Sequence, residues 1–325
     1  MLGKVSPEDL AEHIFGHTGA PLDSVLQGPA YGEDAAAIDL GDSTLVVSTD
    51  PISLAIERVG TLGVYVACND VAASGGDPSW MTSVIFLPGD VDTGAVLETI
   101  TGQMDAVARD LGIAIVGGHS EYNPSLERPL VTLTCMGLAD RYVPTGGAQP
   151  GDRVVLTKGA AIEGTAILAS DFDEDLRDAG IDEATIREAE SYFAEIGVIE
   201  DARVLRDHAT GMHDPTEGGL VDGMLELAIA SGVGLDIDKG AIPIRDPTRE
   251  ICAAMDVDPL RIFGSGALLA TVPAESIPEI EAALEKRGIS MATIGTVEDR
   301  TEPPLRIEGD EFREPVRDDL YRLWE

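Results

Sequence analysis

Hydrophobic residues recur at two spacings in the first part of the chain, and these spacings predict alternating helices and strands. Helical spacing fills 60–74, which ends at Gly75-Gly76, and 93–111. The strand predicted at 113–116 is expected to lead into a loop, Gly117-Gly118-His119-Ser120-Glu121. Short apolar runs predict strands at 35–39, 44–49, 83–87, 113–116 and 129–137.

The stretch 145–152 reads TGGAQPGD, which is a run of turn-forming residues. Helices and strands alternate on both sides of it, and a chain of 325 residues is long for a single core. We therefore expect two domains of α/β to α+β class, 1–147 and 148–325. In the second domain, strands are predicted at 153–157, 267–272 and 292–297, and helices at 162–170, 183–207, about 219–230 and 278–287.

The charge balance is strongly acidic, with 59 acidic against 22 basic residues and a net charge of −37. The acids are spread through the chain, so they do not form one acidic tail. A surface of this sign repels nucleic acid and anionic membranes, and neither is expected as a partner. We interpret the charge as adaptation to a halophilic host, where salt screens the repulsion. An ordinary acidic protein is the alternative.

The three cysteines, Cys68, Cys135 and Cys252, lie far apart in apolar runs, and no CxxC pair occurs. This spacing indicates buried side chains rather than a zinc site or a disulfide framework. No apolar run approaches the length of a membrane span, and the first residues lack the apolar core of a signal peptide. We therefore expect a cytoplasmic location.

Five glycine-flanked or strand-end segments carry acids that suit a magnesium nucleotide. Mg²⁺ takes a few carboxylates and completes its shell with water and phosphate oxygens. Glycines let backbone N–H groups approach phosphates closely. The chain has neither a GxxxxGK[ST] loop nor a GxGxxG turn after a strand. The segments are Gly32-Glu33-Asp34-Ala35-Ala36, Ser48-Thr49-Asp50-Pro51, Asn69-Asp70-Val71-Ala72-Ala73, Gly117–Glu121 and His213–Gly219.

The individual acids differ in how well a purely structural role explains them. Asp70 interrupts an apolar helical face, where an unpaired carboxylate is costly. Asp50 ends an apolar strand and precedes a proline. Asp214 is open to another interpretation, because Asp214-Pro215-Thr216-Glu217 also fits a helix start with Asp214 as N-cap. His119 is either a loop histidine or a substrate contact, and His213 is more simply structural.

The order of these segments resembles one superfamily, that of aminoimidazole ribonucleotide synthetase, thiamine-monophosphate kinase, selenophosphate synthetase and the hydrogenase maturation factor HypE. The start GKVSPEDL, STDPIS and DPTEGGL most resemble HypE-like proteins. The stretches that carry the resemblance are GEDAAAI, STDPIS, NDVAASGGDP, GGHSE, GDRVVLTKGAAIEGTAILA, HDPTEGGL and FGSGALLATVP.

The resemblance implies a two-domain PurM-like fold, with an N-terminal α/β domain that pairs in a homodimer and a C-terminal α+β domain. It implies ATP at the dimer interface and Mg²⁺ on Asp34, Asp50, Asp70 and Glu121. Asp70, Asp214 and His119 are the candidate catalytic residues. The candidate nucleotide-binding residues are Lys4, Gly32, Asn69, Gly117, Gly118, Thr216, Gly218 and Gly219.

The reaction implied is phosphoryl transfer from ATP to an unidentified acceptor, activating a carbonyl, carboxamide or phosphate oxygen. HypE carries an acceptor cysteine at its C-terminus, whereas the last cysteine here is Cys252. Thiamine-phosphate kinases usually read GGDT where this chain reads GGHSE. Two alternatives therefore stay open: an ATP-binding maturation or regulatory partner without catalysis, and a small-molecule kinase similar to thiamine-monophosphate kinase.

Overall fold

The N-terminal half is built on a mixed six-stranded sheet in the order β1-β2-β3-β6-β4-β5. The computed structural model describes residues 3–52, 58–89, 93–300 and 302–325. Within this sheet, β4 and β5 run parallel, and the other described strand pairs are antiparallel. The strands are β1 (Val25–Gln27), β2 (Ala36–Asp39), β3 (Thr44–Ile52), β4 (Asp77–Leu87), β5 (Ala114–Tyr122) and β6 (Leu130–Ala139).

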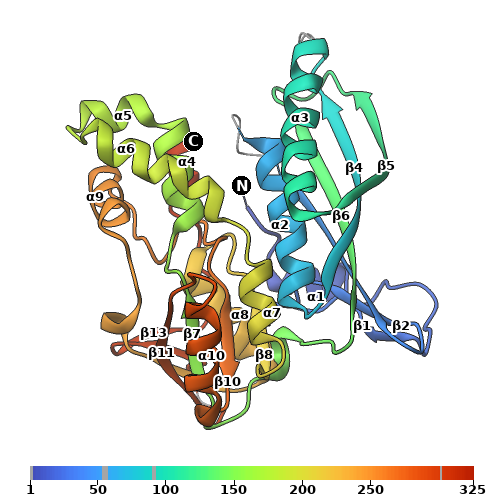
Figure 1. Cartoon of the computed structure of the whole chain (residues 1–325), viewed down its shortest axis with the longest axis vertical. Coiled ribbons are helices and arrows are strands. Elements are labelled where there is room, and N and C mark those ends of the chain that lie inside the picture. The colour runs from blue at the N-terminus through green and yellow to red at the C-terminus, as the bar shows by residue number, and fades with distance from the viewer. Residues whose placement is uncertain (1–2, 53–57, 90–92, 301) are drawn as a thin grey trace.

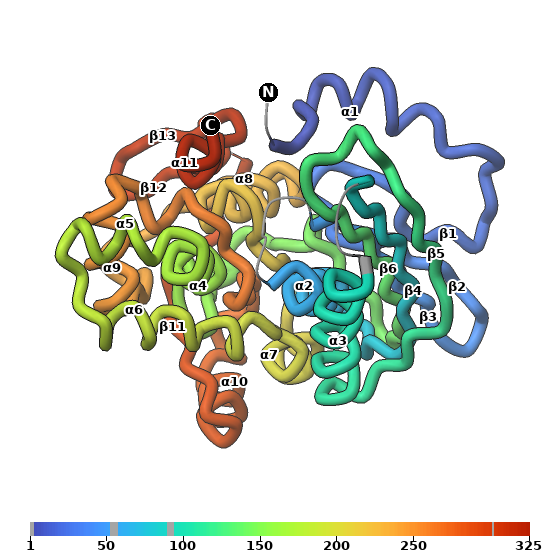
Figure 2. Tube along the Cα trace, turned by 90° about the horizontal axis from the view of Figure 1, so that it is seen from above, coloured from blue at the N-terminus to red at the C-terminus, as the bar shows by residue number. Residues whose placement is uncertain are grey.

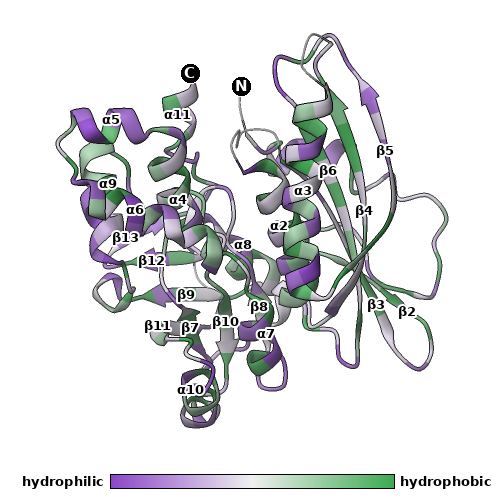
Figure 3. Cartoon of the chain, turned by 45° about the horizontal axis from the view of Figure 1, so that its top comes forward, coloured by the Kyte–Doolittle hydropathy of each residue, from purple (hydrophilic) through white to green (hydrophobic). Residues whose placement is uncertain are grey.

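Helices α2 (Val59–Ala73) and α3 (Thr93–Leu111) cover one face of this sheet, and the other face is open (Figure 1). Alternate residues of β6, such as Leu133 and Cys135, are buried against the helices. Helix α3 is amphipathic, with hydrophilic and hydrophobic stretches along its length (Figure 3). Helix α1 (Pro7–His13) precedes the sheet.

Helix α2 is buried on nearly all sides because it lies between the first sheet and the C-terminal half (Figure 2). This explains its continuous run of apolar and small residues, since a helix enclosed on all sides needs no polar face. Asn69 of α2 joins the two halves: its amide donates to Ile196 O at 2.9 Å, and its oxygen accepts from Val198 N at 2.9 Å. Asp70, the next residue, is thereby held at the boundary between the halves.

The C-terminal half is built on a seven-stranded sheet in the order β13-β12-β9-β11-β7-β10-β8. Its strands are β7 (Arg153–Thr157), β8 (Gly211–His213), β9 (Gly234–Ile237), β10 (Leu269–Val272), β11 (Met291–Glu298), β12 (Leu305–Ile307) and β13 (Asp310–Phe312). Its helices are α4 (Ile162–Asp171), α5 (Asp173–Asp178), α6 (Glu183–Glu190), α7 (Ile199–Leu205), α8 (Gly219–Ser231), α9 (Asp246–Met255), α10 (Ile277–Glu285) and α11 (Tyr321–Trp324).

Most predicted elements are confirmed, and three differences have physical causes. The expected loop at 117–121 is instead part of β5, because its backbone pairs with β4 along 82–86. The single helix expected over 183–207 is divided into α6, a 3₁₀ turn and α7, and Gly197 lies in the break. The pattern missed several elements that are short or amphipathic and lack a long apolar run, namely β1, α5, β8, β9, α9, β12, β13 and α11.

Other structural expectations are also confirmed within the described residues. Cys68, Cys135 and Cys252 are buried free thiols. No helix in the described part of the chain is long and apolar enough to cross a membrane.

Candidate functional site

Four aspartates from separate segments meet at a cavity of about 900 Å³ between the two halves. Asp34 precedes β2, Asp50 lies in β3, Asp70 lies in α2, and Asp214 follows β8. Asp70 and Asp214 are buried, and their carboxylates are close enough to Asp34 that its charge raises both their pKa values. Acids from both halves therefore form one site.

Asp50 and Asp70 share the hydroxyl of Ser48. Ser48 Oγ lies 2.8 Å from Asp50 Oδ2 and 2.6 Å from Asp70 Oδ2. A hydroxyl donates one proton, so it cannot satisfy two charged carboxylates at once. Burial first, and then the neighbouring Asp50, raise the pKa of Asp70 well above its usual value. A cation at this position would therefore compete with a proton for the Asp70 carboxyl group.

A chain of alternating charges runs from Asp34 into the C-terminal half. His213 Nδ1 lies 2.7 Å from Asp34 Oδ1, and His213 Nε2 lies 3.0 Å from Glu226 Oε2. Lys4 Nζ, from the start of the chain, lies 3.2 Å from Glu226 Oε1. The other Asp34 oxygen accepts from Asp214 N at 3.3 Å. Contacts to both carboxylate oxygens, from His213 and from Asp214 N, thus fix the orientation of the Asp34 side chain.

The central members of this chain are charged at neutral pH. Burial alone would lower the pKa of His213, but Asp34 and Glu226 outweigh burial and raise it to about 10. Burial likewise opposes ionisation of Glu226, but Lys4 and His213 outweigh it and lower its pKa to about 2. The imidazolium therefore neutralises part of the acid cluster. Among the described residues, no base lies within hydrogen-bonding distance of Asp50, Asp70 or Asp214.

Asp214 does not cap a helix. Helix α8 begins only at Gly219, with Gly218 as its N-cap, so the alternative interpretation of Asp214 is wrong. Neither carboxylate oxygen of Asp214 accepts a hydrogen bond from the described residues. Burial, and then Asp34, raise the pKa of Asp214 well above its usual value. A buried carboxyl group left in this state needs a ligand.

The acids fit a magnesium ion only when a ligand completes its shell. Among the residues that the structure describes, no three His, Cys, Asp or Glu side chains converge as a ready-made metal site. Mg²⁺ is commonly held by one or two carboxylates together with substrate phosphates and water. The Asp50–Asp70 pair, whose carboxylates both contact Ser48 Oγ, matches that mode of binding.

Several predicted nucleotide-binding residues lie at the same cavity. Lys4, Gly32 and Thr216 line it. Gly32 has φ = +79°, and a Cβ atom there would lie 3.0 Å from Glu226 O, so glycine permits this close approach to α8. Asn69 instead joins the halves, and Gly218 and Gly219 form the turn into α8.

The remaining predicted residues, His119 and Glu121 with Gly117 and Gly118, lie elsewhere in the same chain. They belong to β5, the exposed edge strand. The register joins Asp50 through β6 and β4 to Gly118, which places three strand spacings, roughly 14 Å, between them. His119 and Glu121 pair with Val84 and Phe86, which face the open side of the sheet, whereas Asp50 faces α2.

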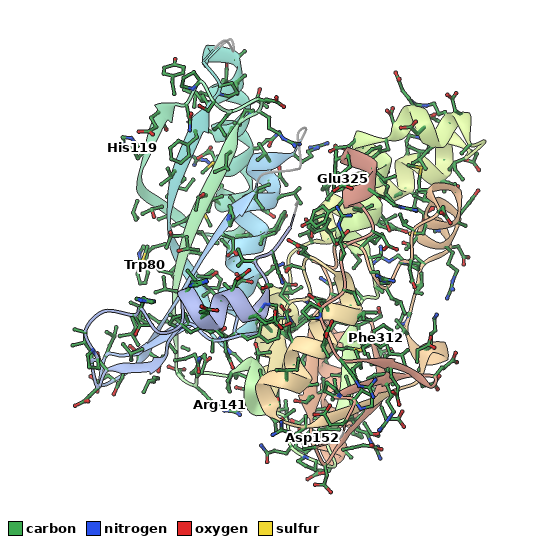
Figure 4. The ribbon with its side chains drawn as sticks, turned by 180° about the vertical axis from the view of Figure 1, so that it is seen from behind. Trp80, His119, Arg141, Asp152, Phe312 and Glu325 are labelled. Carbon is green, nitrogen blue, oxygen red and sulfur yellow. The ribbon has the colours of Figure 1, made fainter. Side chains whose placement is uncertain are left out.

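Within one chain, His119 and Glu121 are therefore not brought together with the aspartates. Their side chains contact each other, with His119 Nε2 3.1 Å from Glu121 Oε2. Figure 4 labels His119, and also Trp80, on the side of the N-terminal half that faces away from the C-terminal half.

Glu226 and Ser48 are site residues that the sequence interpretation did not select, and it ranked His213 as structural. One criterion that singled out Asp70 also applies to Glu226, because Glu226 interrupts the apolar run of α8. Glu163 interrupts the apolar start of α4 in the same way and lines the same cavity. Ser48 carries no such signal, since serine is common at strand ends.

Two family models match most of the chain. The model described as "AIR synthase related protein, N-terminal domain" matches residues 32–139, and the corresponding C-terminal domain model matches residues 149–308. A hydrogenase expression/formation protein, HupE, from Azotobacter chroococcum mcd 1 is 30% identical over 82% of this chain and 79% of its own length. The chain belongs to the AIR synthase related family.

Other AIR synthase related proteins have different names and the same fold. A thiamine-monophosphate kinase from Halobacterium salinarum is 31% identical over 86% of this chain and 91% of its own length. The crystal structure of hydrogenase maturation protein HypE in complex with ATP superposes with a TM-score of 0.66 at 23% identity, over 97% of this chain and 95% of that one. The expected PurM-like two-domain fold is thus confirmed.

Proposed function

We propose that this protein is a magnesium-dependent enzyme that transfers a phosphoryl group from ATP to a small-molecule or carboxamide acceptor. The observation that carries the proposal is the meeting of Asp34, Asp50, Asp70 and Asp214 at one cavity, with His213 as the cation beside Asp34. The ATP complex of the related HypE supports nucleotide binding in this fold. Family membership alone does not select the acceptor.

In this proposal Asp50 and Asp70 hold Mg²⁺ together with the triphosphate. When bound, Mg²⁺ would neutralise the charge on the phosphates and position them. Ser48 fixes the carboxylates of Asp50 and Asp70 at a shared hydroxyl. Asp34, held by His213 on one oxygen and by Asp214 N on the other, is preorganised beside them.

We infer that the functional unit is a homodimer formed through the open face of the N-terminal sheet. Apolar side chains continue across three strands of this face: Val47 pairs with Met136, Met136 with Trp80, and Leu138 lies next along β6. Trp80 is 40% exposed and Leu138 is 38% exposed. An apolar sheet face of this kind is typical of a subunit contact. His119 and Glu121 lie on the same face, so in the dimer they would contact the second subunit. They would then contribute to a nucleotide site at the subunit interface.

Two further inferences complete the proposal. The division at residues 147 and 148 separates the two sheets, and we retain it as the domain boundary. We also infer a cytoplasmic protein from a halophilic host, because the acids exceed the bases by 37. A maturation protein is a second partner to test, because the Azotobacter relative is a hydrogenase expression/formation protein.

A product screen tests the proposed function. The protein is incubated with Mg-ATP and with thiamine phosphate, a formylglycinamidine or a carbamoyl donor, and products are followed by ³¹P NMR and mass spectrometry. Acceptor-dependent phosphorylation that Asp50→Asn abolishes supports the enzyme. ATP binding without turnover for any acceptor, together with capture of a maturation protein, supports the non-catalytic alternative.

A further inference from the structure

One wall of the cavity carries polar groups that the nucleotide proposal does not use. Glu163, at the start of α4, and Ser265, in the loop before β10, both line the cavity and are buried. Glu163 Oε2 has no hydrogen-bond partner among the described residues, and Ser265 lies beside the Glu163 carboxyl group, where its hydroxyl and N–H favour the ionised form against the effect of burial. Backbone bonds fix the position of this wall, because Glu163 N donates to Ser265 O at 3.1 Å and Gly164 N donates to Phe263 O at 2.9 Å.

Nearby acids are satisfied, which sets Glu163 and Asp214 apart from them. Asp318 accepts from Gly218 N at 3.0 Å and from Leu320 N at 2.9 Å, so it holds the loop around it. Glu217 Oε1 accepts from Lys4 N at 2.7 Å. Glu163 lies close enough to Asp214 for its charge to raise the Asp214 pKa. These two carboxyl groups are therefore the unsatisfied pair on this wall.

Among the described residues, the bases near this pair already have acidic partners. Lys158, a base outside the cavity lining that interacts electrostatically with Asp214, pairs with Asp201 at 3.5 Å. Of the cavity-lining bases, Lys4 pairs with Glu226, His213 lies between Asp34 and Glu226, and Arg317 pairs with Glu325. A ligand that adds negative charge here would face two buried carboxyl groups without compensation. The wall therefore selects against an anionic group and favours a positive one.

The same wall is unusually aromatic for this chain, in which only 4% of residues are aromatic. Phe263, Tyr321 and Trp324 all line the cavity. The Phe263 ring centroid lies 5.9 Å from that of Tyr321 and 6.5 Å from that of Trp324. Aromatic rings beside carboxylates are a favourable environment for a flat organic cation.

We propose that Glu163, Ser265 and Asp214, with the Phe263–Trp324 wall, bind the acceptor through a positively charged amidinium, guanidinium or ammonium group. That the bound molecule is the phosphoryl acceptor rests on the proposed function. The binding of a cation at this wall does not depend on turnover. The N–H groups of such a cation would donate to Glu163 Oε2 and to the Asp214 oxygens, which accept no hydrogen bond from the residues that the structure describes.

Titration with three isosteric probes tests this assignment. Benzamidine is a flat cation, benzamide is its neutral counterpart and benzoate its anionic one. Calorimetry on the full chain should give benzamidine at least a tenfold lower Kd than benzamide and no measurable benzoate binding. Glu163→Gln should weaken benzamidine roughly tenfold. The matched control, Glu281→Gln on the exposed side of α10, should leave the Kd unchanged.

The pH dependence gives a second readout that a merely structural role would not change. Burial raises the pKa of Glu163 to about 7, and Asp214, Asp318 and Tyr321 are the titratable groups that face it. Benzamidine affinity should therefore rise between about pH 6 and about pH 8 as Glu163 ionises, and Glu163→Gln should flatten that rise. Circular dichroism confirms that the variant is folded.

Equal Kd values for benzamidine and benzamide, or an unchanged Kd in Glu163→Gln, would overturn the proposal. A parallel Mg-ATP titration of the wild-type protein separates the two claims. Mg-ATP binding without any preference for the cation refutes the acceptor site and leaves the phosphoryl-transfer proposal standing. Cation selectivity without Mg-ATP binding refutes the phosphoryl-transfer proposal and leaves the cation site standing.

Discussion

The imidazole of His213 lies 2.7 Å from the carboxylate of Asp34, and this contact joins the two halves of the chain inside the candidate site. Both side chains are buried, with 4% and 8% of their surface exposed. Asp34 comes from the segment between β1 and β2 of the first sheet, and His213 ends a strand of the second sheet. The geometry of the acids therefore depends on how the halves pack, so stability and ligand binding should respond to the same substitutions.

Replacing His213 tests this dependence. His213→Gln leaves Asp34 and Glu226 buried without their shared cation, so the free energy of unfolding at pH 7 should fall by roughly 3 kcal/mol. Urea unfolding measures the loss. His208→Gln, which changes a partly exposed histidine, is the control and should have little effect.

The pH profile of stability gives the sign of the same interaction. The folded pKa of His213 is raised to about 10 from an unfolded value of about 6.5. Its contribution is then fully present below about pH 6.5 and is lost as the pH rises through about 10. Wild-type stability should decline over this range more steeply than that of His213→Gln. Parallel profiles for the two proteins would contradict the proposed imidazolium.

Magnesium binding should release protons. Because burial and the neighbouring Asp50 raise the pKa of Asp70, Mg²⁺ and a proton compete for this carboxyl group. Calorimetric titration of Mg²⁺ into the ATP-loaded protein, in buffers of different ionisation enthalpy, counts the protons released beyond those from ATP itself. The count should be positive for the wild type and smaller for Asp70→Asn. A heat of binding that is the same in every buffer would contradict this.

The sequence predicted the elements that a strong apolar period defines. Helix α3 begins and ends as predicted, and β7 does too, because each carries an unambiguous pattern. The sequence predicted a strand only over 113–116, because Gly117-Gly118-His119 has the composition of a loop. Pairing with β4 keeps this glycine-rich segment extended as part of β5. Short strands such as β12 depend on tertiary partners in the same way.

The site was predictable where a charged residue breaks an apolar pattern. Asp70 was selected for that reason, and Glu226 and Glu163 satisfy the same criterion. The link from His213 to Asp34 was not predictable, because 179 positions separate residues 34 and 213 and only the packing of two sheets joins them. The face on which His119 lies likewise follows from strand register, which the sequence does not state.

Disrupting the open face of the first sheet should separate the proposed dimer. Trp80→Lys places a charge at the centre of the apolar patch, so the dimer dissociation constant should rise at least roughly tenfold. Analytical ultracentrifugation measures it. Ile229→Lys, at an equally exposed apolar position on α8, should leave the dimer intact. A monomeric wild-type protein would refute the dimer.

Salt should stabilise the protein. Repulsion among the excess acids is screened as the ionic strength rises, so the melting temperature should increase between about 0.1 M and about 2 M KCl. Differential scanning fluorimetry follows the change, and choline chloride at matched ionic strength separates screening from a specific potassium effect. Equal stability in dilute and molar salt would contradict the halophilic interpretation.

The central claim is that the aspartates form a Mg-ATP site, and calorimetric titration of Mg-ATP tests it most directly. The wild type should bind with a Kd that weakens at least roughly tenfold when Mg²⁺ is removed with a chelator. Asp70→Asn, which cannot exchange its proton for the metal, should bind Mg-ATP at least roughly tenfold more weakly than the wild type. Asp42→Asn, in the exposed turn between β2 and β3, should match the wild type. No Mg-ATP binding by the wild type, or equal binding by Asp70→Asn, would contradict the account.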